Sequence, residues 1–345
     1  MKRSLLVTGG AGFIGSHLSE YLLQKYPDFC CVVYDSLSYA GRLSHLENIM
    51  DHPNFIFIQG DIRDQKTLKD VFQRYHICGV FHLAAHTHVD RSIIDPLSFV
   101  ENNVLGCAAL LEICRQYVLT HQRPFRLLHV SSDEVFGSIP APHQVNEEAA
   151  YHPRSPYSAC KAAADHLVRA YYHSYHLPIL ISYCSNNFGP RQHPEKLIPH
   201  TILKALRKEM IPIYGDGLQV RDWLAVADHV KALELIFRCG EIGRSYCVSA
   251  HCERTNLSVV RDICTEIAKI LGTSLTQLES LMTHVTDRPG HDRRYALKAK
   301  RINQELHWQP QEEFNHALAA TVRWYVERPN YFNHANLSLI HISEP

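Results

Sequence analysis

The sequence predicts an α/β protein with a doubly wound parallel sheet and a smaller, partly interleaved C-terminal domain. Short apolar segments alternate with helical segments from residue 4 to about residue 187, which is typical of βαβ units. A glycine-rich turn joins the first apolar segment to the first helix. After residue 187 the alternation weakens and turn dipeptides such as Gly189-Pro190 and His193-Pro194 become frequent.

The composition argues against several classes of protein. The 345 residues include 35 basic and 35 acidic side chains, so we expect neither nucleic acid nor an anionic membrane as a partner. Met1–Ser4 lead directly into a short apolar segment, and no apolar run approaches the ~20 residues of a membrane span. We therefore expect a cytoplasmic protein. Eleven cysteines without a C-x-x-C pair indicate buried free thiols.

Metal binding is not predicted. His82, His86 and His88 lie close together in the sequence. They have no cysteine or carboxylate partner at the usual ligand spacing.

The N-terminal segment has the pattern of a dinucleotide site. Ser4–Thr8 form a predicted strand, and residues 9–15 read Gly-Gly-Ala-Gly-Phe-Ile-Gly before a helix that continues to Tyr26. Glycines allow backbone N–H groups to approach a pyrophosphate at the start of the helix. The next strand, Cys31–Tyr34, ends in Asp35, twenty residues beyond Gly15. A carboxylate there can accept hydrogen bonds from ribose hydroxyls and would repel a 2′-phosphate, which favours NAD over NADP. The alternative is a βαβ unit that binds nothing.

Further alternating elements extend the predicted sheet. Asp61 and Ile62 follow the strand Phe55–Gln59, in a position suited to the adenine. The remaining predicted elements are the helix Gln65–Tyr75, the strand Gly79–Leu83, a helix from about Pro96 to Tyr117, and the strands Phe125–Val130 and Ile179–Tyr183.

Candidate catalytic residues follow the strand Phe125–Val130. Ser132, Asp133 and Glu134 lie where parallel sheets bind ligands, although such a fragment alone also suits a solvated loop or a helix cap. Tyr157 and Lys161 are four residues apart on a predicted helix, so both face the same side. A nearby ammonium would lower the pKa of the phenol toward the working pH, as acid/base catalysis requires.

The domain division is predicted from these patterns. Residues 1–187, and about 222–245, are assigned to the dinucleotide domain, residues 188–336 to the second domain, and residues 337–345 to a tail outside the fold. Arg221 and Arg288 are candidates for a diphosphate clamp, although a basic loop such as Asp287–Tyr295 can also be plain solvated surface.

Several longer motifs in the sequence together point to one protein family. They are His-Val-Asp-Arg-Ser at 88–92, Asn186-Asn187, Pro-Glu-Lys-Leu-Ile-Pro at 194–199, Pro-Ile-Tyr-Gly at 212–215, Arg-Asp-Trp at 221–223 and residues 288–295. Together with the glycine loop and the Tyr157/Lys161 pair, they make residues 2 to 328 resemble the extended short-chain dehydrogenase/reductase family, in particular its NAD-dependent nucleotide-sugar dehydratases.

The resemblance implies a Rossmann domain, a tightly bound NAD and a lyase reaction on a nucleotide sugar, with dTDP-glucose favoured. Tyr157, helped by Lys161 and Ser132, would take the O4 proton as C4 is oxidised. Glu134 would then remove the C5 proton, and Asp133 would protonate the departing O6 hydroxyl. Hydride returning to C6 would give a 4-keto-6-deoxy sugar for deoxysugar biosynthesis, such as that of rhamnose.

The same resemblance implies the binding residues and the assembly. We expect a homodimer formed through a four-helix bundle by the segments Pro96–Tyr117 and Tyr157–Tyr175. The expected cofactor residues are Gly9, Gly12, Phe13, Ile14, Gly15, Asp35, Ser36, Leu37, Ser38, Asp61, Ile62, Leu83, Ala84, Ala85, Thr87, Asn102, Tyr157, Lys161 and Asn187. The expected substrate residues are Thr87, Ser132, Asp133, Glu134, Asn186, Glu195, Lys196, Leu197, Pro212, Ile213, Tyr214, Arg221, Asn256, Arg288, His291 and Asp292.

Three residues depart from the family pattern: His86 replaces Glu, Ser132 replaces Thr and Phe136 replaces Tyr. Three other functions stay open. UDP-glucose could be the substrate, a nucleotide-sugar 4-epimerase would share the glycine loop and the Tyr157/Lys161 pair, and a non-catalytic NAD-binding regulator would keep the fold. An epimerase has no use for the acid and base at 133 and 134.

Overall fold

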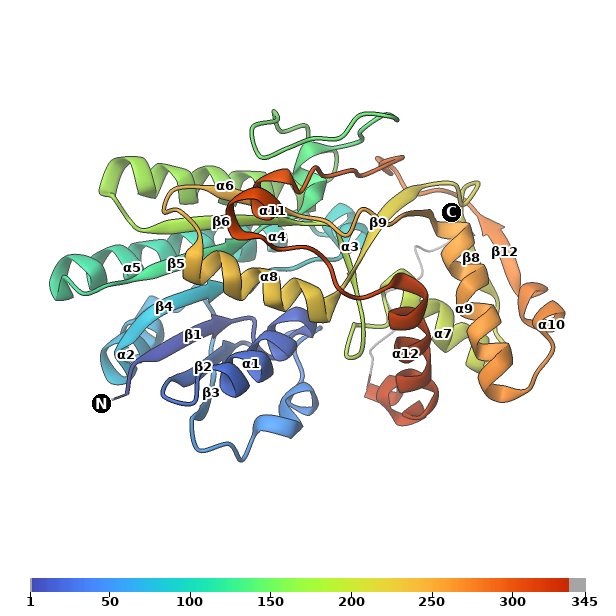
Figure 1. Cartoon of the computed structure of the whole chain (residues 1–345), viewed down its shortest axis with the longest axis horizontal. Coiled ribbons are helices and arrows are strands. Elements are labelled where there is room, and N and C mark those ends of the chain that lie inside the picture. The colour runs from blue at the N-terminus through green and yellow to red at the C-terminus, as the bar shows by residue number, and fades with distance from the viewer. Residues whose placement is uncertain (1, 335–345) are drawn as a thin grey trace.

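A seven-stranded parallel sheet forms the centre of the larger part of the molecule in the computed structural model, which describes residues 2–334 (Figure 1). The strand order is β10-β6-β5-β4-β1-β2-β3. The strands are β1 Ser4–Thr8, β2 Cys30–Asp35, β3 Phe55–Gln59, β4 Ile77–His82, β5 Arg126–Val130, β6 Ile179–Cys184 and β10 Ser245–Val248. The chain order reverses between β1 and β4, where open α/β sheets bind ligands beyond the strand ends.

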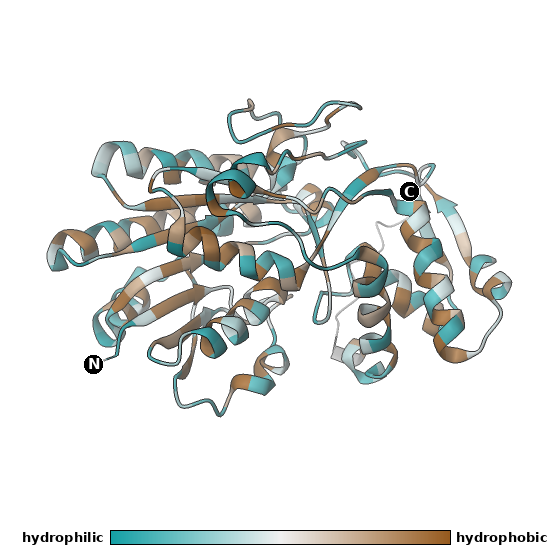
Figure 2. Cartoon of the chain, in the orientation of Figure 1, coloured by the Kyte–Doolittle hydropathy of each residue, from teal (hydrophilic) through white to brown (hydrophobic). Residues whose placement is uncertain are grey.

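Helices cover both faces of this sheet, which confirms the predicted doubly wound fold. On one face lie α1 Phe13–Lys25 and α8 Val226–Cys239, with α11 Lys300–Leu306 beside α8 and β10. On the other lie α2 Gln65–Tyr75, α5 Gly106–His121 and α6 Pro156–Tyr175. The strands are mainly hydrophobic (Figure 2), because a sheet buried on both faces needs apolar residues on both sides.

The predicted helix Pro96–Tyr117 is longer in the structure. After α3 Val89–Ile94, the chain forms α4 Pro96–Phe99, a π-helical segment η2 Val100–Leu105, and α5. Among the described residues, the continuous stretch Pro96–His121 is long and apolar enough to cross a membrane, which differs from the expectation that no segment is. Half of its most apolar window is buried inside the fold.

The remaining elements pack around a separate hydrophobic core, on the right of Figure 1. A three-stranded sheet joins β7 Asn186–Phe188, β9 Val220–Ala225 and β11 Glu253–Thr255, and β8 Ile211–Tyr214 pairs with β12 Met282–Val285. The helices here are α7 Leu197–Leu206, α9 Asn256–Leu271, α10 Leu275–Glu279 and α12 Phe314–Val326, and the 3₁₀ segments of the chain are η1 Leu43–Ile49, η3 Asp133–Phe136 and η4 Pro329–His334.

The chain crosses between the two groups of elements more than once. β9 belongs to the small sheet, whereas α8 packs against β5 and β6 and β10 becomes an edge strand of the large sheet. β10 was not among the predicted strands. The predicted domain boundaries stay a prediction, and residues 337–345 lie outside the described residues.

Candidate active site

A cavity lies along the C-terminal ends of the central strands. Most of the predicted residues line it: Gly9, Gly12, Phe13, Ile14, Gly15, Asp35, Ser36, Ser38, Ile62, Leu83, Ala84, Ala85, Thr87, Asn102, Ser132, Asp133, Glu134, Tyr157, Lys161, Asn186, Asn187, Glu195 and Lys196. The sequence separates these residues by up to 187 positions, and the parallel sheet brings them together.

Two glycines of the loop, Gly9 and Gly15, leave no room for a side chain. Gly9 has a φ of +71°, and a Cβ atom there would lie 2.7 Å from the backbone nitrogen of Ala84. A Cβ atom on Gly15 would lie 2.2 Å from the carbonyl oxygen of Gly9. The first turn of α1 therefore stays open to the cavity, and its free N–H groups suit a phosphate.

Asp35 ends β2 at the rim of the same cavity. Its carboxylate accepts hydrogen bonds from the backbone N–H groups of Ala11, at 2.9 Å, and Leu37, at 2.8 Å. Burial raises the pKa of this carboxyl, and the two hydrogen bonds oppose that shift. Two predicted cofactor residues do not line the cavity: Leu37, and Asp61, whose carboxylate is held by the Arg63 guanidinium at 2.7 Å.

Unpaired polar atoms show that the cavity suits a large polar ligand. The side-chain oxygens of Asn186, Asn187 and Gln192 are buried and have no hydrogen-bond partner among the described residues. Leaving such atoms without partners is costly. A dinucleotide, with its ribose hydroxyls and carboxamide, has the donors that they lack, so the cavity fits this ligand.

The carboxyl pair that follows β5 is asymmetric. The Ser132 hydroxyl accepts from the backbone N–H of Glu134 at 3.3 Å and lies 3.2 Å from Asp133 Oδ1. Asp133 is buried, its Oδ2 has no partner among the described residues, and burial and the Glu134 carboxylate raise its pKa well above the usual range. The Glu134 carboxylate accepts from the Tyr295 hydroxyl at 3.4 Å. The first carboxyl therefore suits a proton donor and the second a proton acceptor.

Tyr157 and Lys161 both point into the cavity from the first turns of α6. The Lys161 ammonium donates to the carbonyl oxygen of Val130 at 2.6 Å. Burial and the Glu134 carboxylate raise the pKa of Tyr157 well above its usual value, and the Ser132 hydroxyl opposes that shift. In the protein alone the phenol is thus protonated, and the predicted lowering of its pKa by Lys161 is not among the main effects on it.

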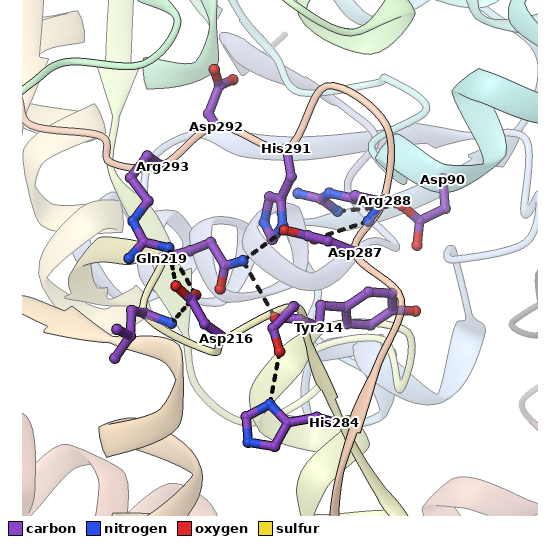
Figure 3. A network of polar contacts seen from close by, with 12 residues as sticks. Asp90, Tyr214, Asp216, Gln219, His284, Asp287, Arg288, His291, Asp292 and Arg293 are labelled. Atoms are coloured by element: carbon purple, nitrogen blue, oxygen red, sulfur yellow. Dashed lines mark hydrogen bonds and ion pairs between the residues drawn. The ribbon is translucent and has the colours of Figure 1, made fainter.

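The predicted residues Tyr214, Arg288 and His291 take part in a polar network that Figure 3 shows from close by. The Asp287 carboxylate contacts His291 Nδ1 at 2.6 Å and accepts from Gln219 Nε2 at 2.9 Å. The Arg288 guanidinium is 3.4 Å from Asp90 on α3. The loop after β12 is thereby connected to two other elements. It reaches Tyr214 of β8 through Gln219, and it reaches α3 of the larger part through Asp90.

Arg221 belongs to the same region. It is buried, its guanidinium lies 4.2 Å from the centre of the Tyr295 ring, and it donates to the carbonyl oxygen of Asp292 at 3.0 Å. Tyr295 also donates to the Asp292 carboxylate at 2.9 Å, so this arginine lies close to the residue that contacts Glu134. The predicted substrate residues outside the cavity lining are Leu197, Pro212, Ile213, Tyr214, Arg221, Asn256, Arg288, His291 and Asp292.

Some lining residues were not predicted to bind a ligand. The Tyr39 ring stacks against the Arg91 guanidinium at 4.4 Å, and its hydroxyl contacts Thr87. The position of this tyrosine after a strand end was the one available signal. The unpredicted lining residues are Tyr34, Tyr39, Ala40, Gly41, Gly60, His86, Val130, Ser131, Cys184, Ser185, Gln192 and His193.

One group of possible metal ligands lies behind the cavity, and it is not the histidine group considered from the sequence. His82, Cys107 and His129 are buried, and their ligand atoms lie within 4.8 Å of one another. Burial and the positive charge of Lys161 lower the pKa of both histidines, whereas burial raises the pKa of the Cys107 thiol to about 12. A second cation there would be repelled by the Lys161 ammonium, so we assign no metal to this group.

The fold and the cavity define a dinucleotide-binding α/β protein with an acid/base site, of the extended short-chain dehydrogenase/reductase type. A family model described as GDP-mannose 4,6 dehydratase matches residues 6–321. The dTDP-glucose 4,6-dehydratase of Neisseria gonorrhoeae is 46% identical over 336 residues, which cover 94% of this chain and 96% of the relative. The chain belongs to the family of the dTDP-glucose 4,6-dehydratases.

Solved structures agree with this assignment. The dTDP-glucose 4,6-dehydratase of Streptomyces venezuelae, with NAD and TYD bound, is 40% identical and has a TM-score of 0.87 over 95% of this chain and 98% of that one. The UDP-glucose 4-epimerase of Thermotoga maritima, with UDP-glucose, is 25% identical with a TM-score of 0.83 over 94% and 99% of the two chains. Epimerases and dehydratases thus share this fold, and the site residues must distinguish them.

Proposed function

We propose that this protein is a lyase that converts dTDP-glucose to dTDP-4-keto-6-deoxyglucose with a tightly bound NAD. The asymmetry of Asp133 and Glu134 carries the proposal. A 4-epimerase needs no acid and base for C5 and C6, whereas a dehydratase must remove one proton and supply another during the loss of water. Asp133, whose pKa is raised, can supply a proton, and the adjacent Glu134 can remove one.

The chain binds NAD through the glycine loop and Asp35. NAD supplies an acceptor for the hydrogen of C4 and a donor for C6. The open N-terminus of α1 would hold the pyrophosphate and Asp35 would accept from the ribose, and the unpaired oxygen of Asn187 belongs to the lining of the same cavity. A buried carboxylate at the end of β2 disfavours the extra phosphate of NADP.

The protein residues manage the protons. Tyr157 takes the O4 proton, for which its raised pKa must fall when the substrate and cofactor are bound. A positive charge favours the phenolate, and Lys161, four residues along α6, supplies one. Oxidation at C4 acidifies the C5 proton. Glu134 then removes that proton, and Asp133 gives its own proton to the departing O6 hydroxyl.

The nucleotide and the sugar are bound by residues from both groups of elements. Arg221 and Arg288 supply guanidinium groups for the diphosphate, and the latter has an unpaired Nε among the described residues. Asn186, Glu195, Lys196 and Asn256 offer polar groups, of which the Lys196 ammonium now donates to the carbonyl of Thr87 at 2.6 Å.

The protein forms a homodimer in this proposal. Large apolar side chains are exposed along one set of helices, from α3 through α5 and at the end of α6: Ile94 (63%), Leu97 (72%), Leu105 (58%), Leu119 (61%) and Tyr175 (51%). Such a surface on a folded protein indicates an interface. Pairing of α5 and α6 with their copies gives a four-helix bundle with two-fold symmetry.

We also place the protein in the cytoplasm. All eleven cysteines are free, and most are buried, which suits a reducing compartment.

Product analysis with two substrates tests the proposal. Purified protein is incubated separately with dTDP-glucose and UDP-glucose, and the products are identified by mass spectrometry and NMR. We expect a 4-keto-6-deoxy product, formed faster from dTDP-glucose. A 4-epimer as the product, or no turnover of either sugar by protein that holds NAD, would overturn it.

A further inference from the structure

A buried carboxylate that has no part in the proposed chemistry lies one helical turn after Lys161. The Asp165 side chain is fully buried. It accepts hydrogen bonds from the Ser131 hydroxyl at 2.7 Å and the Tyr151 hydroxyl at 3.1 Å, and its other oxygen lies 3.1 Å from His129 Nε2. Burial of a carboxylate is costly unless an opposite charge or several donors compensate for it.

The Lys161 ammonium is a buried cation four residues before this carboxylate on α6. Arg169, four residues after it, is only half-buried and donates to the Tyr183 hydroxyl at 2.8 Å. Residues four apart on a helix lie on the same face, with their Cβ atoms roughly 6 Å apart. Burial lowers the pKa of Lys161, and the Asp165 carboxylate is the strongest influence in the opposite direction. Both side chains are buried, and each bonds to the end of β5: Lys161 to the Val130 carbonyl oxygen and Asp165 to the Ser131 hydroxyl. We call these two buried, opposite charges the charge pair, although no direct ion pair joins them.

Several other titratable groups lie around Lys161: Tyr157 on α6, Cys107 on α5, His82 on β4, His129 on β5 and Cys184 on β6, with Asp133 and Glu134 of η3 on the cavity side. Burial lowers the pKa of both histidines and raises the pKa of each thiol to about 12. Asp165 is the carboxylate that raises the pKa of Lys161 and so compensates the ammonium.

We propose that Asp165 is a positioning residue that holds Lys161 in its ammonium form, so that proton transfer at Tyr157 depends on this buried charge pair. The inference rests on the proposed function for its catalytic part and on the buried network for its electrostatic part. Without Asp165, desolvation alone would act on Lys161. The ammonium would lose its proton at a lower pH, and the phenolate form of Tyr157 would lose the positive charge four residues along α6.

A thermal-unfolding cycle tests the charge pair without substrate or activity. Asp165→Asn, Lys161→Met and the double variant are melted from about pH 6 to about pH 10, a range that ends near the pKa of a free lysine. In Asp165→Asn the folded pKa of Lys161 falls further below its unfolded value. The unfolded chain then binds more protons, so stability rises with pH. We expect Asp165→Asn to lower the melting temperature most at the low end of this range.

The Lys161→Met background provides the control for the cycle. There we expect Asp165→Asn to have a smaller effect with no such pH dependence, because no buried ammonium remains. A loss of equal size in both backgrounds, constant with pH, would show that Asp165 only connects β5 to α6 and would overturn the proposal.

A pH profile of the holoenzyme tests the catalytic part. The rate of cofactor reduction after addition of dTDP-glucose is measured by absorbance. In Asp165→Asn we expect the alkaline limit of this rate to move down by about one to two pH units. Tyr151→Phe, which removes a hydrogen bond to the same carboxylate but keeps its charge, should retain the parental limit.

The outcomes separate the two proposals. An Asp165→Asn enzyme that is slower by the same factor at every pH would contradict the role of the charge pair. If the parental holoenzyme does not reduce its cofactor with dTDP-glucose, the proposed function fails, and the unfolding cycle still decides whether Asp165 and Lys161 are coupled.

Discussion

The Asp133 carboxyl lies buried beside Glu134, and its pKa is raised by burial and by the neighbouring carboxylate. Adjacent acidic residues in a desolvated site cannot both ionise easily, so one holds a proton when the other is charged. This relationship separates the proposed dehydratase from an epimerase of the same fold, because it prepares an acid and a base next to each other.

Asp133→Asn should lose activity and should become more stable than the parent at neutral pH. A carboxyl with a raised folded pKa contributes stability that is present below its unfolded pKa, near 4, and is lost as pH rises through the folded value. The variant should therefore gain stability relative to the parent as pH increases, by roughly 1.4 kcal/mol for every tenfold difference between the acid constants of the folded and unfolded states. Thermal melts at acidic and neutral pH measure this. Equal stability differences at both pH values would contradict the raised pKa.

Asp35→Ala should change cofactor preference. The carboxylate accepts from ribose hydroxyls and repels a 2′-phosphate, so its loss should weaken NAD binding more than NADP binding. Titration of cofactor-free protein with each dinucleotide gives the two affinities. Asp28→Ala, at an exposed position before β2, is the control and should bind both as the parent does. A parental preference for NADP would disprove the assignment.

A pair of charges on the exposed helical surface should separate the dimer. Leu97→Glu with Leu105→Glu places carboxylates where we expect the apolar interface, and burying them there costs more than exposing them in a monomer. Light scattering at micromolar concentration should show a dimer for the parent and a monomer for the variant. Leu271→Glu, at a similarly exposed leucine (51%) at the end of α9, should stay dimeric. A parent protein that is monomeric at this concentration would contradict the proposed homodimer.

Arg221→Lys should raise KM for the nucleotide sugar by about ten- to a hundredfold, the effect of losing a charge-assisted hydrogen bond. The lysine keeps the charge but loses the planar group that stacks on Tyr295. Steady-state kinetics of the holoenzyme measure the change. Arg261→Lys, at an exposed position on α9, provides the matched control. An unchanged KM for Arg221→Lys would show that this residue does not bind the nucleotide sugar.

Glu134→Gln and Tyr157→Phe should fail at different steps. The first variant keeps the group that takes the O4 proton, so the bound cofactor should become reduced and water should not be lost. Removing a general base costs ~10² to 10⁴-fold in rate, which single-turnover absorbance resolves. The second variant should show no reduction. Glu279→Gln, exposed on α10, should act as the parent. Failure of both variants at one step would show that the roles are wrongly assigned.

The sequence predicted the large sheet well because its signals are local. The glycine loop, the apolar runs of β1 to β6 and the turn after each strand recur at βαβ spacing, and the structure confirms them. β10 was missed because its four residues, Ser245–Val248, gain their strand conformation from pairing with β6. The π-helical segment in the long helix likewise has no recognised sequence signal here.

The site was predictable where residues follow strand ends and less so where distant segments meet. Asp133 could be placed by the end of its strand, Tyr157 by its helical spacing to Lys161, and Asn187 by the family resemblance, and all three line the cavity. The contact of Tyr295 with Glu134, and that of Asp90 with Arg288, join segments more than 150 residues apart. No periodicity encodes such contacts. The raised pKa of Tyr157 is likewise a consequence of burial that only the packed structure reveals.

The most direct test of the central claim is the fate of a deuterium label at C4 of dTDP-glucose. The label is followed by NMR after a complete turnover by the purified holoenzyme. The account predicts a 4-keto-6-deoxy sugar in which the deuterium has moved to C6, because the hydrogen removed from C4 is returned there after water is lost. A product that retains the hydroxyl at C6 and carries the deuterium at C4 would identify an epimerase and contradict the account.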